Sequence, residues 1–94
     1  MSVSIYDPTA ARDLFELRQY IHTTISQSRP VDMANRLDVI GGWLDRIVFP
    51  NKELFQVTLN IVRFNVRVNP DTTQIGVCVG VLELLLQALP ADAC

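Results

Sequence analysis

The fold class depends on one stretch in the middle of the chain, FQVTLNIVRFNVRV at residues 55–68. Apolar and polar residues alternate strictly from Phe55 to Ile61, and they alternate again, in the opposite phase, from Val62 to Val68. Such alternation is typical of a strand with one buried face, and the β-branched and aromatic content favours the same assignment. The adjacent apolar pair Ile61-Val62 is what a bulge would leave where the phase slips. We therefore predict a long strand or a β-ribbon here.

A helical interpretation of the same stretch is the alternative. In a helix, Gln56, Asn60, Arg63 and Arg67 would form one narrow polar stripe. That interpretation would make the protein an all-α four-helix bundle.

Two amphipathic helices are predicted before this stretch. The first runs from Thr9 to about Ser26, with Asp7 as its N-cap and Pro8 at its first position. The second runs from about Val31 to Val48, and Phe49-Pro50 ends it. Apolar residues recur at helical spacing in both, at Ala10, Leu14, Leu17, Ile21 and Ile25, and at Met33, Leu37, Ile40, Leu44 and Ile47.

A third helix is predicted from Pro70 to Leu89, with Asn69 as its N-cap. Its part from Ile75 to Leu89 is the most apolar segment of the chain, and the exceptions there share one face: Gly76, Gly80, Glu83 and Gln87. A helix that is apolar on nearly all sides is expected to be buried, either at the centre of its own domain or between subunits.

Glycines mark two places where we expect helices to approach closely. Gly41 and Gly42 are adjacent inside the second helix, where each costs roughly 1 kcal/mol relative to alanine. A close backbone contact or a kink should compensate that cost. Gly76 and Gly80 have the spacing that lets two helices pack tightly.

We predict a small α+β fold of one domain, residues 1–94, in which 90–94 form a loose tail. The only other strand candidate, Ser2–Tyr6, would cover barely half of the long strand and leave an open edge. Pairing across a subunit boundary would satisfy that edge. The predicted self-association interface comprises Val57, Leu59, Ile61, Phe64, Val66, Gly76 and Gly80.

The composition also favours a homo-oligomer. Hydrophobic residues make up 49% of only 94 residues and charged residues 19%, which is difficult to bury in a small monomer. The formal net charge of -2 argues against general binding to nucleic acid or to an anionic membrane. A local basic strip is still conceivable, and Arg63 and Arg67 are the candidate nucleic-acid contacts.

The sequence contains no recognisable catalytic or metal-binding motif. His22 is the single histidine, Glu83 is the single carboxylate of the apolar stretch 75–89, and Cys78 and Cys94 do not suggest a disulfide framework. We therefore expect no catalytic, cofactor-binding or metal-ligating residues. The first residues do not resemble a secretory signal, so we expect a cytoplasmic protein.

These observations predict a non-enzymatic, homo-oligomeric interaction protein that serves as an adaptor or regulator, such as a viral or phage accessory factor. The alternative is a small nucleic-acid-binding or coat-like subunit. A small enzyme, with Glu83 as a general acid or base, is the least favoured class.

Overall fold

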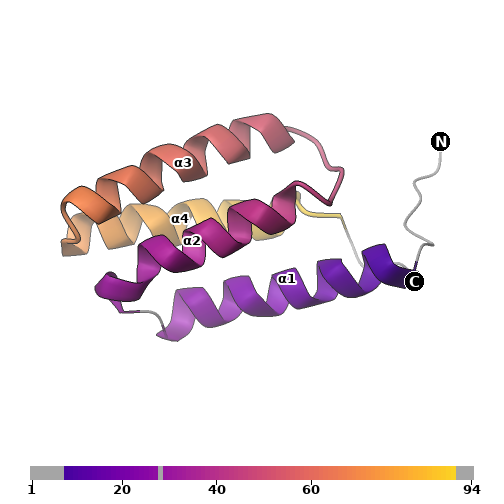
Figure 1. Ribbon diagram of the computed structural model, residues 1–94, viewed down its shortest axis with the longest axis horizontal. Coiled ribbons are helices and arrows are strands. Elements are labelled where there is room, and N and C mark those ends of the chain that lie inside the picture. The colour runs from indigo at the N-terminus through magenta and orange to yellow at the C-terminus, as the bar shows by residue number, and fades with distance from the viewer. Residues whose placement is uncertain (1–7, 28, 91–94) are drawn as a thin grey trace.

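The computed structural model describes residues 8–27 and 29–90, and within these ranges it contains four helices and no strand. The helices are α1 (Pro8–Gln27), α2 (Pro30–Leu44), α3 (Lys52–Val68) and α4 (Thr72–Ala88). They run alternately in opposite directions, so that helices adjacent in sequence are antiparallel (Figure 1). The described chain is therefore all-α and consistent with a four-helix bundle.

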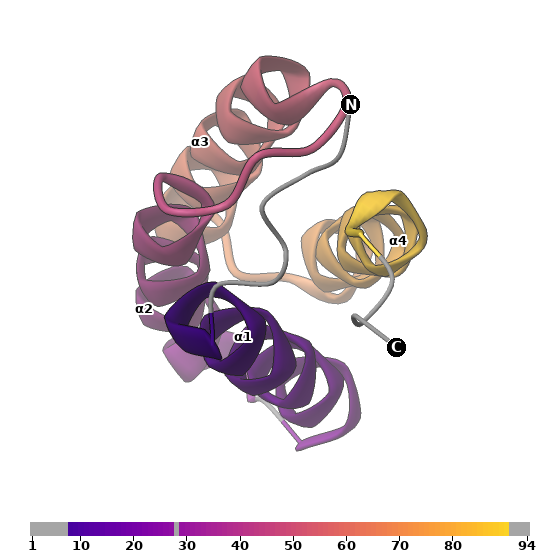
Figure 2. The same cartoon turned by 90° about the vertical axis from the view of Figure 1, so that its right-hand side faces the viewer.

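Viewed along the long axis, α1, α2 and α3 follow one another in an arc (Figure 2). The last helix, α4, lies across from α2 and contacts both α1 and α3. One core fills the space between the helices. Its buried apolar residues are Leu14, Leu17, Ile21, Met33, Ala34, Leu37, Ile40, Leu44, Ile47, Phe49, Leu59, Val62, Val66, Cys78, Leu82, Leu85 and Leu89.

The predicted α+β fold is wrong, because the stretch 55–68 lies within helix α3. The two alternating runs repeat after seven residues, which is close to two turns of an α-helix. The slip at Ile61-Val62 is therefore helical periodicity and not a β-bulge. A helix also satisfies its own backbone donors, whereas a strand would need a neighbour that the described chain does not contain.

The predicted amphipathic helices are confirmed, although α2 ends at Leu44 and not near Val48. The connection from α2 to α3 still buries Ile47 and Phe49, while Val48 between them is 80% exposed. Its last residue, Asn51, has a φ of 63°, a left-handed conformation that asparagine tolerates better than most residues.

The start of α4 also differs from the prediction, because α4 begins at Thr72 and not at Pro70. Its N-cap is Asp71 and not Asn69, and the Asp71 side chain accepts a hydrogen bond from the backbone N–H of Gln74 at 2.8 Å. A carboxylate at this position satisfies one of the backbone donors that a helix start leaves open.

The prediction that α4 is central in its own domain is wrong, whereas burial between subunits stays a prediction. Cys78, Leu82 and Leu85 face the core, but Val77 and Leu84 on the other side are 47% and 59% exposed. In a four-helix bundle no helix is central, so each one keeps an outer face toward solvent. None of the described helices combines the length and the hydropathy that crossing a bilayer requires.

Polar contacts join neighbouring helices outside the core. Between α1 and α4, the Arg18 guanidinium donates to the backbone carbonyls of Leu89 and Pro90, just beyond the end of α4. The predicted strand Ser2–Tyr6, the Asp7 cap and residues 91–94 of the predicted tail lie outside the described residues.

Candidate functional site

Helix α3 carries two apolar stripes, and only one of them is used by the core. The inner stripe consists of the buried Leu59, Val62 and Val66, with the partly buried Phe55 packed against the same core. The outer stripe, which we call the α3 seam, consists of Leu54, Val57, Ile61, Phe64 and Val68. The side chains of the seam are between 55% and 67% exposed.

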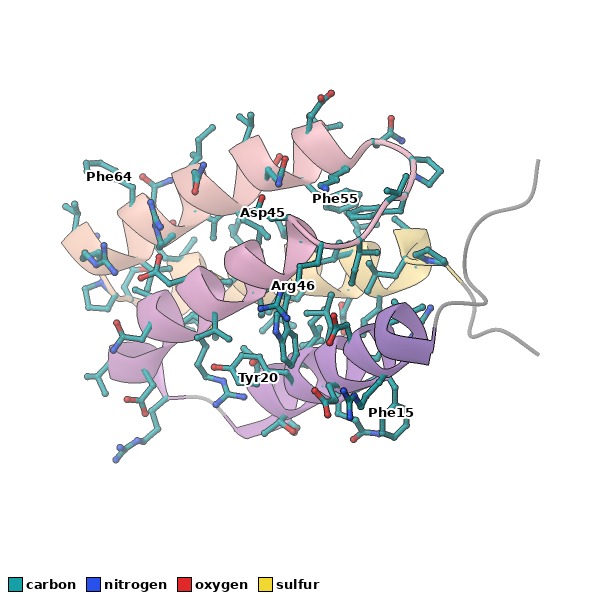
Figure 3. All side chains as sticks on the ribbon, turned by 45° about the vertical axis from the view of Figure 1, so that its right-hand side comes forward. Phe15, Tyr20, Asp45, Arg46, Phe55 and Phe64 are labelled. Atoms are coloured by element: carbon teal, nitrogen blue, oxygen red, sulfur yellow. The ribbon has the colours of Figure 1, made fainter. Side chains whose placement is uncertain are left out.

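The α3 seam has the spacing of a helix-pairing surface. Its members follow one another by three, four, three and four residues, the spacing by which apolar residues line the contact between two paired helices. Figure 3 shows Phe64 projecting from the outer side of α3, whereas Phe55 lies on the side of the bundle interior. The Phe55 ring packs there against Phe49, with 6.0 Å between the ring centroids.

Polar residues border the seam on both sides. Glu53, Asn60 and Arg67 lie along the border that faces α2, and all three are exposed. Thr58 and Asn65 lie along the other border. Within the described residues, Glu53 forms no ion pair.

The two arginines of α3 share one carboxylate of α2. An Arg63 Nη1 and the Arg67 Nη2 both donate to Asp38, the latter over 3.2 Å. The hydrogen bond from Arg63 lowers the pKa of the Asp38 carboxyl below its ordinary value and outweighs the opposite effect of its partial burial. Arg63 and Arg67 are thus brought together, but around an acidic group that neutralises part of their charge.

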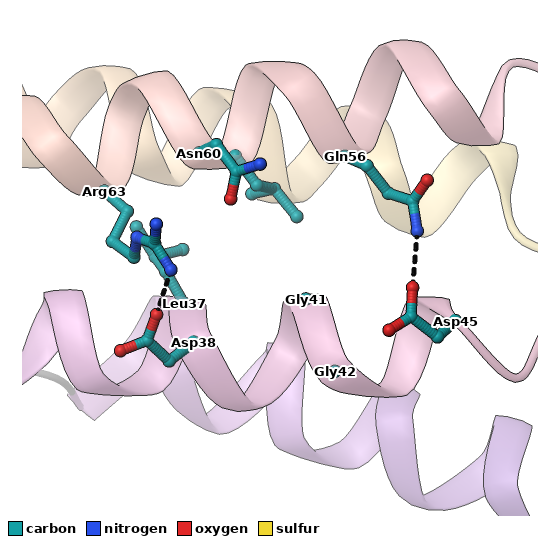
Figure 4. Close-up of a pocket in the computed structure, with 9 residues that line it drawn as sticks. Leu37, Asp38, Gly41, Gly42, Asp45, Gln56, Asn60 and Arg63 are labelled. Carbon is teal, nitrogen blue, oxygen red and sulfur yellow. Dashed lines mark hydrogen bonds and ion pairs between the residues drawn. The ribbon is translucent and has the colours of Figure 1, made fainter.

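A polar groove of about 280 Å³ lies between α2 and α3 (Figure 4). Asp38 and Arg63 meet at one end, and at the other end the Gln56 amide donates to Asp45 over 2.8 Å. Gly41 and Gly42 line the middle, and a Cβ added to either would meet no other atom within 4 Å. The expected close backbone approach at these glycines is therefore absent within the described chain. The charged and amide groups at the ends of the groove hold α2 and α3 together.

The predicted interface residues separate into three groups. Val57, Ile61 and Phe64 are on the α3 seam, together with Leu54 and Val68, which the strand interpretation left out. Leu59 and Val66 are only 3% and 1% exposed and belong to the core. On α4, Gly76 is exposed and Gly80 is half-buried, and neither is closely approached by another helix of the same chain.

The residues considered for chemistry are dispersed. His22 is exposed on α1 and Glu83 is exposed on α4. In the described ranges, no three His, Cys, Asp or Glu side chains come close enough together to hold a metal ion. Burial raises the pKa of the Cys78 thiol to about 11.

No protein-family model, no curated protein and no solved structure matches this chain. Function therefore has to be inferred from the chemistry of the described surface.

Proposed function

We propose that this chain is a non-enzymatic interaction protein that self-associates through the α3 seam. The observation that carries the proposal is the exposure of five large apolar side chains at helix-pairing spacing on a helix whose opposite face already fills the core. In this role the protein acts as a homo-oligomeric adaptor or regulator.

The size of the exposed surface supports an interface. At the observed exposed fractions, the five side chains of the seam present on the order of 500 Å² of apolar surface in one band. A band of this size is comparable to the largest apolar patch on a typical monomeric protein, about 300–600 Å², and such patches often serve a function. Because the inner stripe alone supplies the core contacts of α3, folding does not account for Leu54, Val57, Ile61, Phe64 and Val68.

The alternative of a nucleic-acid-binding subunit receives less support. Arg63 and Arg67 would have to leave or share Asp38 in order to contact phosphate. Binding of a random oligonucleotide that weakens steeply with salt would favour this alternative, and no binding at low salt would reject it.

Light scattering over a range of protein concentrations tests the proposal. The wild type should have at least the mass of a dimer at micromolar concentration. Phe64→Glu should shift the equilibrium to monomer, because a carboxylate would be buried in the paired seam. Its thermal unfolding, measured on the monomer, should change little, since Phe64 is 64% exposed.

Val48→Glu is the matched control. Val48 is an equally apolar and more exposed residue that lies outside the seam, on the connection from α2 to α3. This variant should keep the wild-type mass. The proposal is wrong if the wild type stays monomeric up to hundreds of micromolar, or if Val48→Glu and Phe64→Glu dissociate it equally.

A further inference from the structure

We infer that two copies of this chain pair antiparallel along α3, with Glu53 of each copy beside Arg67 of the other. This inference rests on the proposed function and specifies the occupant of the α3 seam and its orientation. It follows from the order of apolar and charged residues along the helix.

The apolar residues of the seam fit a two-fold antiparallel arrangement. The seam contains two pairs of residues that are three positions apart, Leu54 with Val57 and Ile61 with Phe64. When two such helices run in opposite directions, the first residue of such a pair on one helix lies opposite the second residue of such a pair on the other helix. Centred between Val57 and Ile61, the arrangement sets Leu54 against Phe64 of the partner subunit and Val57 against Ile61 of the partner subunit. Symmetry repeats both contacts, which gives four layers.

The bordering charges distinguish the two possible directions. In the antiparallel arrangement, Glu53 and the partner's Arg67 both lie just beyond the layer that Leu54 forms with the partner's Phe64, on the same side of the seam. The two-fold axis repeats this pair and brings Asn60 beside Asn60 of the partner subunit. Two ion pairs and one amide pair then border the seam.

A parallel arrangement lacks this complementarity. In register, it would set Glu53 beside Thr58 of the partner subunit, and Asn60 beside Asn65 of the partner subunit, because bordering residues then pair with an offset of five positions. No opposite charges would meet. The charges therefore favour the antiparallel direction.

Both charged residues are able to form the intermolecular pair. Glu53 is exposed and, within the described residues, has no ion-pair partner of its own. The Arg67 side chain is 53% exposed and shares the Asp38 carboxylate with Arg63. Two guanidinium groups therefore have a single carboxylate between them. The partner's Glu53 would supply the second acidic group that this cluster lacks.

The area is sufficient for a dimer only when the borders take part. The four seam residues in these layers contribute on the order of 400 Å² per copy, and a stable interface buries about 800 Å² per partner. Glu53, Thr58, Asn60, Asn65 and Arg67 supply the polar remainder, as the rim of an interface does. The expected dimer is therefore modest in affinity, in the micromolar range, and depends on salt.

A charge-exchange experiment tests the direction. Glu53→Arg and Arg67→Glu should each weaken self-association by about ten-fold in sedimentation equilibrium, because each places like charges together twice. An equimolar mixture of the two variants should recover dimers close to wild-type affinity, since every pair between unlike variants is again opposite in charge. Glu83→Arg, an exposed reversal on α4, is the control and should leave the affinity unchanged.

Because Arg67→Glu also removes a contact with Asp38, cysteine cross-linking provides a second measurement. In a Cys94→Ser background, Leu54→Cys and Phe64→Cys should cross-link to each other when mixed and oxidised, and neither should cross-link efficiently to itself. Self-cross-linking of each variant alone would instead establish a parallel pair and overturn the inference.

The outcomes separate this inference from the proposed function. A wild type that is monomeric at all concentrations would reject both. A second outcome would support the seam as an interface but reject the antiparallel direction. In that outcome Phe64→Glu dissociates the wild-type dimer, the charge-exchange variants leave its affinity unchanged, and each cysteine variant cross-links to itself.

Discussion

Arg36 on α2 donates a hydrogen bond from its Nε to the hydroxyl oxygen of Thr24 on α1, over 2.7 Å. Thr24 is fully buried, and its hydroxyl in turn donates to the backbone carbonyl of Tyr20 at 2.7 Å. The guanidinium carbon of Arg36 also lies 4.1 Å from the centroid of the Tyr20 ring, which packs edge-on against Trp43. This chain of contacts fixes α1 against α2 at the edge of the core.

Removing the Arg36 guanidinium should therefore destabilise the fold. Arg36→Met keeps much of the apolar stem but leaves the buried Thr24 hydroxyl without its donor, and we expect a loss of about 1–3 kcal/mol in the free energy of unfolding. Urea denaturation measures this. Arg29→Met, which removes a highly exposed pair with Asp32, is the control and should change stability by less than about 0.5 kcal/mol. Equal effects of the two substitutions would contradict a specific role for the Arg36 contact.

Asp38 should make stability depend on pH in the acidic range. The pKa of Asp38 is lower in the folded state than in the unfolded chain. At a pH within the ordinary carboxyl range, the folded protein therefore binds fewer protons than the unfolded chain does. The resulting stabilisation is complete above about pH 4 and is lost below it as the carboxylate becomes protonated. The effect is small because the side chain is 40% exposed.

The Asp38→Asn variant isolates this contribution. It should be less stable than the wild type at neutral pH, and the difference should shrink as the pH falls toward 3. Urea denaturation at several pH values gives the comparison. A difference that stays constant from pH 7 to pH 3 would mean that the ion pairs with Arg63 and Arg67 do not stabilise the folded state.

Sequence periodicity was sufficient for three of the helices and insufficient for α3. The apolar positions of α1 and α2 recur on a single stripe, so each segment predicts one buried face. Helix α3 has a second apolar stripe on its outer side, and the two stripes together imitate the alternation of a strand. The same outer stripe that misled the assignment of the fold is the candidate interaction surface.

The candidate site could be predicted only in part for the same reason. Val57, Ile61 and Phe64 were identified because they are apolar in a segment expected to pair with another chain, and they are indeed exposed. Leu54 and Val68 follow only from the helical repeat, which also places Leu59 and Val66 inside. The sharing of Asp38 by Arg63 and Arg67 required the packing of α2 against α3, which one sequence does not contain.

Cys78 should be unreactive while the protein is folded. The thiol is fully buried and its pKa is raised to about 11, so almost none of it is the nucleophilic thiolate at neutral pH. In a Cys94→Ser background, a disulfide reagent such as Ellman's should modify Cys78 only as fast as the chain unfolds. Rapid modification in native buffer would show that α4 opens locally. Stability should also decline as the pH rises from about 9 toward 11, because the unfolded chain then loses a proton that the folded chain retains.

The glycines of α2 give a prediction that reverses the sequence-based expectation. A close backbone contact or a kink was expected to compensate for the poor helix propensity of Gly41 and Gly42, but a Cβ on either would meet nothing within 4 Å, which leaves no close contact. Each position should therefore accept alanine, and Gly42→Ala should raise the free energy of unfolding by roughly 1 kcal/mol. Thermal unfolding should shift upward by about 4–8 °C for a domain of this size.

Gly41→Ala completes the comparison, because both glycines line the groove between α2 and α3, but Gly41 is half-buried there whereas Gly42 is exposed. If the groove is open in solution, both variants should be stabilised alike and should keep the wild-type mass. If Gly41→Ala alone lowers stability or dissociates the oligomer, another chain must approach the groove so closely that only glycine fits. Measuring the melting temperature at low and high protein concentration separates these cases, since a lost intermolecular contact matters only where the oligomer is populated.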